Sequence, residues 1–153
     1  MIEEDDPARD TLVVDMDAVQ KGLEKEFENN GTFIIDGHYG HEVVDTEKVQ
    51  LVIVLRRAPW ELQEVLQNRL YSYDKVWENL DAEILGVIAN EVLEEYPREK
   101  LHETDTTDKS PDDAATEIMK VIKGETPPSI EPIDWITYPE TLRVLVNRTC
   151  TLS

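Results

Sequence analysis

The sequence predicts an α/β fold in which helices flank a mostly parallel sheet. Segments with helical spacing of their apolar residues alternate along the chain with short apolar strands. The strands expected at 32–36 and 50–55 are apolar at nearly every position, which is typical of parallel strands covered on both faces. With 153 residues, 40% of them hydrophobic, the chain is long enough for one domain with a sizeable core.

The N-terminal part of the chain is expected to contribute one helix. We expect a loop or a frayed start at residues 1–10 and then a helix that ends near Glu28. Asp15 or Asp17 can cap its N-terminus through a side-chain oxygen, and the sequence Asn-Asn-Gly that ends at Gly31 is typical of a C-cap. Apolar residues recur at every fourth position of this segment, at Val19, Leu23 and Phe27.

Two helices are expected after strand 50–55. Pro59 suits the first position of a helix, because that position needs no N–H donor, and residues 69–72 interrupt the apolar pattern. A second, longer helix is expected from about Asp74 to Pro97. Its apolar residues follow helical spacing: Val76, Trp77, Leu80, Ile84, Val87, Ile88 and Val92.

A short strand and a further helix are expected next. The strand covers residues 101–105. Ser110 then begins a helix, because a capping serine is followed by a proline and two acidic residues, and Gly124 ends it. The buried face of this helix is expected to consist of Ala114, Ile118, Val121 and Ile122.

Residues 125–153 are expected to form a proline-rich tail to a domain made of residues 1–124. The tail holds four of the eight prolines in the chain, so we expect it to be extended and to wrap over the surface, anchored by Trp135 and Ile136. For residues 142–146 two interpretations stay open, an added edge strand or sequence from a shifted gene end.

The chain is strongly acidic, with a formal net charge of −19. Such a surface repels phosphate backbones, so direct nucleic-acid binding is not expected, whereas a basic partner such as a ribosomal protein would be attracted. The simpler interpretation is a surface that keeps the protein soluble.

The sequence shows neither an apolar run of about 18 residues nor a signal peptide, so no membrane partner is expected. The single cysteine, Cys150, allows no internal disulfide and fits a reducing cytoplasm.

Charged side chains at the ends of two expected strands form the candidate site. Asp36 ends the first strand, His38 follows two positions later, and Arg56 and Arg57 end the second. Because ligands of α/β sheets bind beyond the C-terminal ends of the strands, we expect these side chains near one crevice. Carboxylate, imidazole and guanidinium groups suit a site for phosphate and Mg²⁺. The alternative for Arg56 is an ion pair with an acidic residue.

Other features of the sequence are weaker indications of a functional site. His38 and His41 suggest a two-histidine metal site, but neither a cysteine nor an H-E-x-x-H sequence accompanies them. Trp60 and Trp77 are more typical of core packing than of stacking on a base. None of the six glycines falls in the pattern G-x-x-x-x-G-K-[ST], so this sequence holds no P-loop motif.

Several segments, in this order, resemble the adenylate kinase isoenzyme 6 family, the archaeal and nuclear adenylate kinase-like ATPases associated with small-subunit ribosomal RNA processing. These segments are Phe33–His38, Val52–Arg56, Pro59–Leu62, Asn79–Ile88 and Asp105–Ser110. The resemblance extends from about Asp5 to Trp135. It implies a P-loop kinase fold with a core, an AMP-binding region and a lid, and an enzyme that transfers phosphate from ATP to AMP with Mg²⁺.

The resemblance also implies regions and catalytic roles. Residues 10–30 match part of the AMP-binding region, and residues 69–80 match the lid region. Asp36 would act on the hydration shell of Mg²⁺, so its contact with the metal would pass through water. His38 would act on the attacking water or on coupled motion, and Arg69 would clamp phosphates from the lid.

The nucleotide-binding residues implied by the resemblance lie further along the chain. Arg56 would close the third core strand, and Thr106 and Thr107 would belong to the loop around adenine. ATP and AMP are the expected ligands, and a basic small-subunit ribosomal protein is the expected macromolecular partner.

Two departures from this family affect the interpretation. Its members begin with a strand, a P-loop and a helix, roughly 40 residues in all, so we expect the sequence in hand to be a truncated kinase. The lid usually reads Arg-Gly-Tyr, whereas Leu70 stands in place of the glycine, and leucine resists a positive φ.

Two alternative functions stay open: a non-catalytic acidic protein that binds a basic ribosomal protein, and a remnant that binds only a nucleoside monophosphate.

Overall fold

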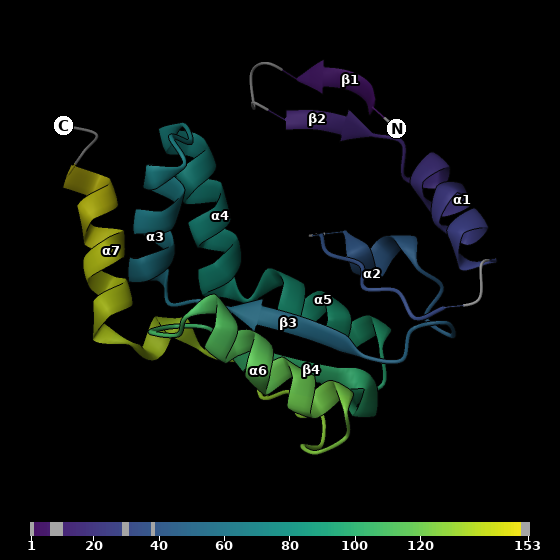
Figure 1. Cartoon of the computed structure of the whole chain (residues 1–153). Helices are drawn as coiled ribbons and strands as arrows, with labels where there is room; N and C mark the ends of the chain where they lie inside the picture. The colour runs from purple at the N-terminus through teal and green to yellow at the C-terminus, as the bar shows by residue number, and fades with distance from the viewer. Residues whose placement is uncertain (1, 7–10, 29–30, 38, 151–153) are drawn as a thin grey trace. The chain divides into compact units, whose positions relative to one another are not determined.

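A computed structural model describes residues 2–6, 11–28, 31–37 and 39–150. The chain divides into two compact units, residues 1–50 and residues 51–153. Figure 1 labels the elements of both units along the chain.

The N-terminal unit begins with a β-hairpin followed by a helix. Strand β1 (Ile2–Asp6) pairs antiparallel with β2 (Thr11–Val14). The loop expected at the start of the chain is therefore wrong for residues 2–6, because the apolar stretch that follows supplies a pairing partner. Helix α1 (Met16–Phe27) confirms the expected helix, and Asp15 caps it by accepting a hydrogen bond from the Ala18 N–H at 2.9 Å.

The expectation of a strand at residues 32–36 is wrong. Within the described part of the chain these residues join no sheet, and Phe33 and Ile34 are exposed. The Phe33 ring packs at 5.3 Å from the Phe27 ring, and a short helix, α2 (Gly40–Val43), follows. An apolar run predicts a preference for burial, but a strand also needs a neighbouring strand with which to exchange hydrogen bonds.

The C-terminal unit contains the expected parallel sheet. Strand β3 (Val52–Arg56) pairs in parallel with β4 (Leu101–Asp105), so that Arg56 lies beside Asp105 at their carboxyl ends. The described part of this unit contains five α-helices and two short 3-10 helices: α3 (Pro59–Asn68), α4 (Tyr73–Leu85), α5 (Val87–Glu95), η1 (Arg98–Lys100), α6 (Pro111–Ile122), η2 (Trp135–Thr137) and α7 (Pro139–Cys150). Helix α5 packs against both strands, and α6 lies in front of them in Figure 1. The α/β class predicted from the sequence is confirmed.

Gly86 divides the long helix expected from Asp74 to Pro97 into α4 and α5. Its φ of 63° lies in the left-handed region, which a residue without a Cβ adopts at no steric cost. A Cβ at this position would lie 3.6 Å from the Arg56 Nη2 atom. The apolar stripe continues across the break, so the periodicity alone predicted one helix.

The C-terminal segment is only partly the extended tail that was expected. Trp135 anchors it, as expected, with a side chain only 2% exposed, whereas the expectation for Ile136 is wrong because it is 50% exposed. Residues 142–146 belong to α7 and not to an edge strand. Val144 is buried in a core cluster together with Leu66, Val76, Trp77 and Leu80.

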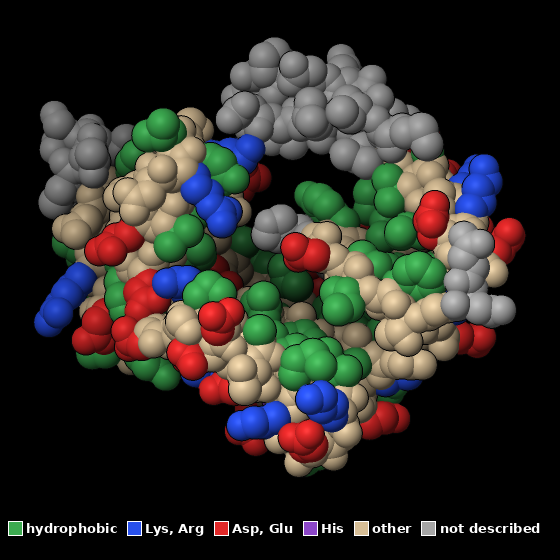
Figure 2. Space-filling view, in the orientation of Figure 1, with side chains coloured by type: hydrophobic (Ala, Val, Ile, Leu, Met, Phe, Trp, Pro, Cys, Tyr) green, Lys and Arg blue, Asp and Glu red, His purple; other side chains and the backbone are tan. Residues whose placement is uncertain are grey.

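Acidic side chains recur across the face shown in Figure 2, with basic and hydrophobic side chains between them. Among the described residues, no helix has both the length and the apolar character needed to cross a membrane.

Candidate functional site

Arg56, the last residue of β3, has its guanidinium group buried between two acidic side chains. Its Nε donates to Glu83 Oε1 at 2.8 Å, and its Nη1 donates to Glu103 Oε1 at 2.6 Å. Its Nη2 donates to the backbone carbonyl of Glu83 at 2.9 Å. The side chain is 2% exposed. Arg56 thus forms the ion pair with acidic residues that was the alternative interpretation of this position.

Glu83, near the end of α4, accepts three hydrogen bonds on one carboxylate oxygen. The donors to Oε1 are the Arg56 Nε at 2.8 Å, the Trp135 Nε1 at 2.7 Å and the Arg57 backbone N–H at 3.2 Å. Burial raises the pKa of the Glu83 carboxyl group, and the positive charge of Arg56 and the hydrogen bonds counteract part of this rise. Glu83 therefore joins α4, the end of β3 and the C-terminal segment at one atom.

The turn after β4 is tied to the end of β3. The Thr106 backbone N–H and its hydroxyl group both donate to the Arg56 carbonyl, each at 2.8 Å. The Ala58 N–H donates to the Thr107 hydroxyl oxygen at 2.9 Å, and the Thr107 N–H donates to Asp105 Oδ1 at 2.8 Å. The structure thus brings together three residues that the sequence predicted for nucleotide binding: Arg56, Thr106 and Thr107.

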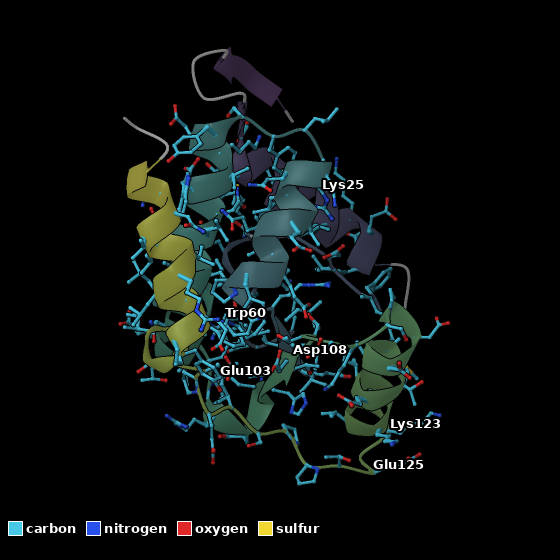
Figure 3. The ribbon with its side chains drawn as sticks, turned by 90° about the vertical axis from the view of Figure 1, so that its left-hand side faces the viewer. Lys25, Trp60, Glu103, Asp108, Lys123 and Glu125 are labelled. Carbon is cyan, nitrogen blue, oxygen red and sulfur yellow. The ribbon has the colours of Figure 1, made fainter. Side chains whose placement is uncertain are left out.

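A second acidic side chain fastens the same turn to α3. Glu61, in the first turn of α3, forms an ion pair with Arg57 at 3.0 Å and accepts a hydrogen bond from the Asp108 N–H at 3.1 Å. Asp108 has a φ of 56°, which an aspartate tolerates better than most residues. Figure 3 labels Trp60, Glu103 and Asp108 in this part of the unit. Residues 105–108 therefore form a turn held to both β3 and α3.

The other predicted site residues lie elsewhere in the chain. Asp36 belongs to the N-terminal unit, where its side chain is exposed, and His38 lies outside the described residues. Arg69 follows α3, and its backbone N–H donates to the Val65 and Leu66 carbonyls at 3.2 Å. Its side chain is exposed, and no other described side chain pairs with it.

Leu70 adopts the conformation that was expected to be unfavourable for leucine. Its φ is 59°, and its side chain is 90% exposed. Its N–H donates to the Gln67 carbonyl at 2.9 Å, which closes the turn after α3. A turn whose positive φ would favour glycine is thus formed here by leucine.

Helix α4 is in contact with the C-terminal helix α7. Arg148 on α7 donates to both carboxylate oxygens of Asp81 on α4, at 2.9 and 3.0 Å. Its guanidinium carbon also lies 4.7 Å from the centre of the Trp77 ring. The expectation that Trp77 is a packing residue is confirmed by its burial in the core.

Sequence reasoning missed Glu83, Glu103 and the polar role of Trp135. Glu103 carried a signal, because an acidic residue in the middle of a buried strand needs a cationic partner. Glu83 carried none, since it occupies a polar position of a helix, where acidic residues are common. Trp135 was predicted as an anchor, but its indole N–H partner depends on the tertiary fold.

Mg²⁺ is the metal ion that the resemblance implies. Among the described residues, no group of three or more His, Cys, Asp or Glu side chains is arranged to hold a metal ion. Mg²⁺ in kinase sites is usually held by one or two carboxylates together with substrate phosphates and water. The exposed carboxylate of Asp36 fits this limited role.

Comparisons with known proteins agree on one group. Residues 1–86 match the family described as AAA domain. The chain is 37% identical over 133 residues to a protein named "Putative adenylate kinase" from Pyrococcus furiosus. The matched residues cover 87% of the chain and 70% of that protein. A protein of the same name from Natronomonas pharaonis is 39% identical over 87% of the chain and 74% of its own length. A third, from Thermococcus gammatolerans, is 36% identical over 89% of the chain and 73% of its own length.

Proposed function

The chain belongs to the AAA domain family and to the family of the archaeal proteins named "Putative adenylate kinase", and from this premise we propose that it transfers a phosphate group from ATP to AMP. The α/β fold is P-loop kinase-like, and the relatives support a nucleotide kinase-like function. The proposal specifies the two nucleotides and assigns roles to individual residues.

One observation carries the proposal. The turn with Thr106 and Thr107 closes over the carboxyl end of β3 through hydrogen bonds to the Arg56 carbonyl and the Ala58 N–H. Ligands of parallel α/β sheets bind beyond this end of the strands. A turn fixed in this way presents its backbone in one conformation, which favours recognition of a flat base such as adenine at low entropic cost.

The buried guanidinium of Arg56 acts on the nucleotide only indirectly. Its hydrogen bonds to Glu83 and Glu103 hold the end of β3, so the carbonyl group that receives Thr106 stays in place. The exposed side chain of Arg69 would instead contact the phosphate oxygens, to which a guanidinium group can donate two hydrogen bonds.

Asp36 and His38 would act at the phosphates. Mg²⁺, when bound with the nucleotide, neutralises charge on the phosphate oxygens. Asp36 would orient the water molecules of that ion through its exposed carboxylate. His38 would accept or hold the proton of the attacking group.

Formation of ADP from ATP and AMP in the presence of Mg²⁺ tests this proposal. The protein should include any open reading frame directly upstream of Met1. We expect turnover in the parent protein and a loss of about 100-fold or more in Asp36→Asn and His38→Ala. Asp45→Asn is the matched control, because Asp45 is an exposed carboxylate of the same unit and should leave the rate unchanged.

The outcomes of this assay test the kinase function and the roles of Asp36 and His38 separately. A parent protein that forms no ADP would contradict phosphoryl transfer. Normal turnover in both variants would instead contradict the roles of Asp36 and His38 while leaving the kinase function in place.

A second candidate function is favoured by the net charge of −19. A protein this acidic attracts basic partners, and the resemblance described above points to a basic small-subunit ribosomal protein and to small-subunit RNA maturation. Calorimetric titration with such a protein tests it. Binding of the basic protein without binding of ATP or AMP would favour the second candidate over the kinase.

A further inference from the structure

The peptide group between Arg56 and Arg57 is fixed on both of its sides. Its N–H, which belongs to Arg57, donates to Glu83 Oε1 at 3.2 Å. Its carbonyl, which belongs to Arg56, accepts two hydrogen bonds from Thr106 at 2.8 Å each. Since a peptide group is planar, a displacement on the Glu83 side also moves the carbonyl that holds Thr106.

The Glu83 carboxylate is in turn held from the C-terminal segment. The Trp135 indole N–H donates to Glu83 Oε1 at 2.7 Å. This hydrogen bond is shorter than the one that the Arg57 backbone N–H donates to the same atom at 3.2 Å. The Trp135 side chain is 2% exposed, so no water competes for this donor. Hydrogen bonds from a neutral donor to a carboxylate are stronger than those between neutral groups.

The C-terminal segment has further attachments near this point. The Glu103 N–H donates to the Ser129 carbonyl at 2.9 Å, so the segment runs along β4. The Ile133 N–H donates to Glu103 Oε1 at 3.4 Å, and the Ile133 carbonyl accepts from the Arg56 Nη2 at 3.4 Å. Trp135 is therefore held in position by the residues that precede it.

We propose that Trp135 and Glu83 are positioning residues for the nucleotide-binding turn. They act through a series of hydrogen bonds from the Trp135 indole N–H to the Glu83 carboxylate, to the Arg56–Arg57 peptide and to Thr106, here called the Trp135 relay. Its effect on nucleotide affinity depends on the proposed function, whereas its effect on the turn does not. Neither residue touches the nucleotide, and the relay makes the C-terminal segment part of the site.

Trp60 offers a matched control for the indole N–H. Its ring packs edge-on against Trp135 at 5.8 Å between ring centres, so both rings belong to one aromatic cluster. Within the described residues nothing accepts a hydrogen bond from the Trp60 indole N–H. Trp60→Phe and Trp135→Phe remove the same atoms from the same cluster, but only Trp135→Phe breaks the relay.

Binding of ATP and of inorganic triphosphate to the full chain tests the proposal. We expect Trp135→Phe to weaken ATP binding by about 3- to 10-fold, because one net hydrogen bond is lost, and to leave triphosphate binding unchanged. Trp60→Phe should change neither affinity by more than about 2-fold. Glu83→Gln keeps an acceptor oxygen for the indole and should retain more ATP affinity than Trp135→Phe.

Amide hydrogen exchange tests the relay without a ligand. We expect the Arg57 and Thr106 amides to exchange faster in Trp135→Phe than in the parent protein and in Trp60→Phe. ATP affinity or exchange rates in Trp135→Phe equal to those of the parent would overturn the proposal, as would an equal loss for ATP and triphosphate. If the parent protein, with any open reading frame directly upstream of Met1 included, binds no adenine nucleotide, the proposed function fails, and the exchange rates alone decide the relay.

Discussion

Two arginines of the C-terminal unit were expected to contact nucleotide, and the structure gives them opposite environments. Arg56, at the end of β3, is 2% exposed and lies between Glu83 and Glu103. Arg69, at the end of α3, is exposed and precedes Leu70, which has a positive φ. The surrounding carboxylates account for the difference. An arginine enclosed by acidic side chains organises the protein, whereas an exposed arginine remains available to a ligand.

The largest expected effect follows from removing the buried guanidinium. Arg56→Met leaves the Glu83 and Glu103 carboxylates buried without their cation, and we expect the free energy of unfolding to fall by about 3–5 kcal/mol. Arg69→Met is the matched control and should change it by less than about 0.5 kcal/mol. Urea unfolding followed by circular dichroism measures both. Similar losses in the two variants would remove the contrast between the two arginines.

A smaller effect is expected where the backbone turns beside Arg56. Gly86→Ala places a Cβ on a residue with a φ of 63°, and we expect a loss of about 1–2 kcal/mol from this conformation. Gly22→Ala is the control with the opposite sign, since Gly22 lies within α1 and its Cβ would contact nothing within 4 Å. It should raise stability by about 0.5–1 kcal/mol. Thermal unfolding of both variants checks the signs, and a stabilising Gly86→Ala would contradict this account of the turn.

A still smaller effect is expected where α7 contacts α4. Arg148→Ala removes an exposed ion pair with Asp81 and a contact with the Trp77 ring, and we expect a loss of roughly 1 kcal/mol. Arg143→Ala, an exposed arginine of the same helix, should change stability by less than about 0.5 kcal/mol. Unfolding in low and high salt separates the contributions, because salt screens the ion pair more than the ring contact. Equal stability of the two variants would show that Arg148 does not hold α7 to α4.

The smallest effect concerns pH. The pKa of Glu83 in the folded protein is raised above its ordinary value of 4.5, so the folded state holds this proton more tightly than the unfolded state. Its contribution to stability is present below pH 4.5 and is lost as the pH rises through the folded pKa. Glu83→Gln cannot titrate. The stability of the parent protein relative to Glu83→Gln should therefore decrease between acidic and neutral pH, and an increase would contradict a raised pKa.

Local signals in the sequence predicted local structure well. Pro59 and Ser110 begin helices as expected, and Asp15 caps α1, because the conformation at a helix start depends on only a few neighbouring residues. The strands expected at 50–55 and 101–105 are also present, at 52–56 and 101–105, and each supplies the parallel pairing partner of the other.

Features that depend on distant residues were not predictable from the sequence. Residues 32–36 have the composition of a strand but pair with no described segment. The break at Gly86 lies beside the side chain of Arg56, thirty positions earlier in the chain. Arg56, Thr106 and Thr107 were predicted as site residues. The acids that bury Arg56 and the indole that holds Glu83 emerge only when strands, helix and C-terminal segment come together.

Titration of the isotopically labelled full chain with ATP, followed through its assigned backbone amide resonances, tests the central claim most directly. If the carboxyl end of β3 and β4 binds the nucleotide, the amides of Arg57, Thr106 and Thr107 should shift, while those of Arg143 and its neighbours in α7 should stay unchanged. Binding of ATP with no shift at Thr106 and Thr107 would contradict the claim.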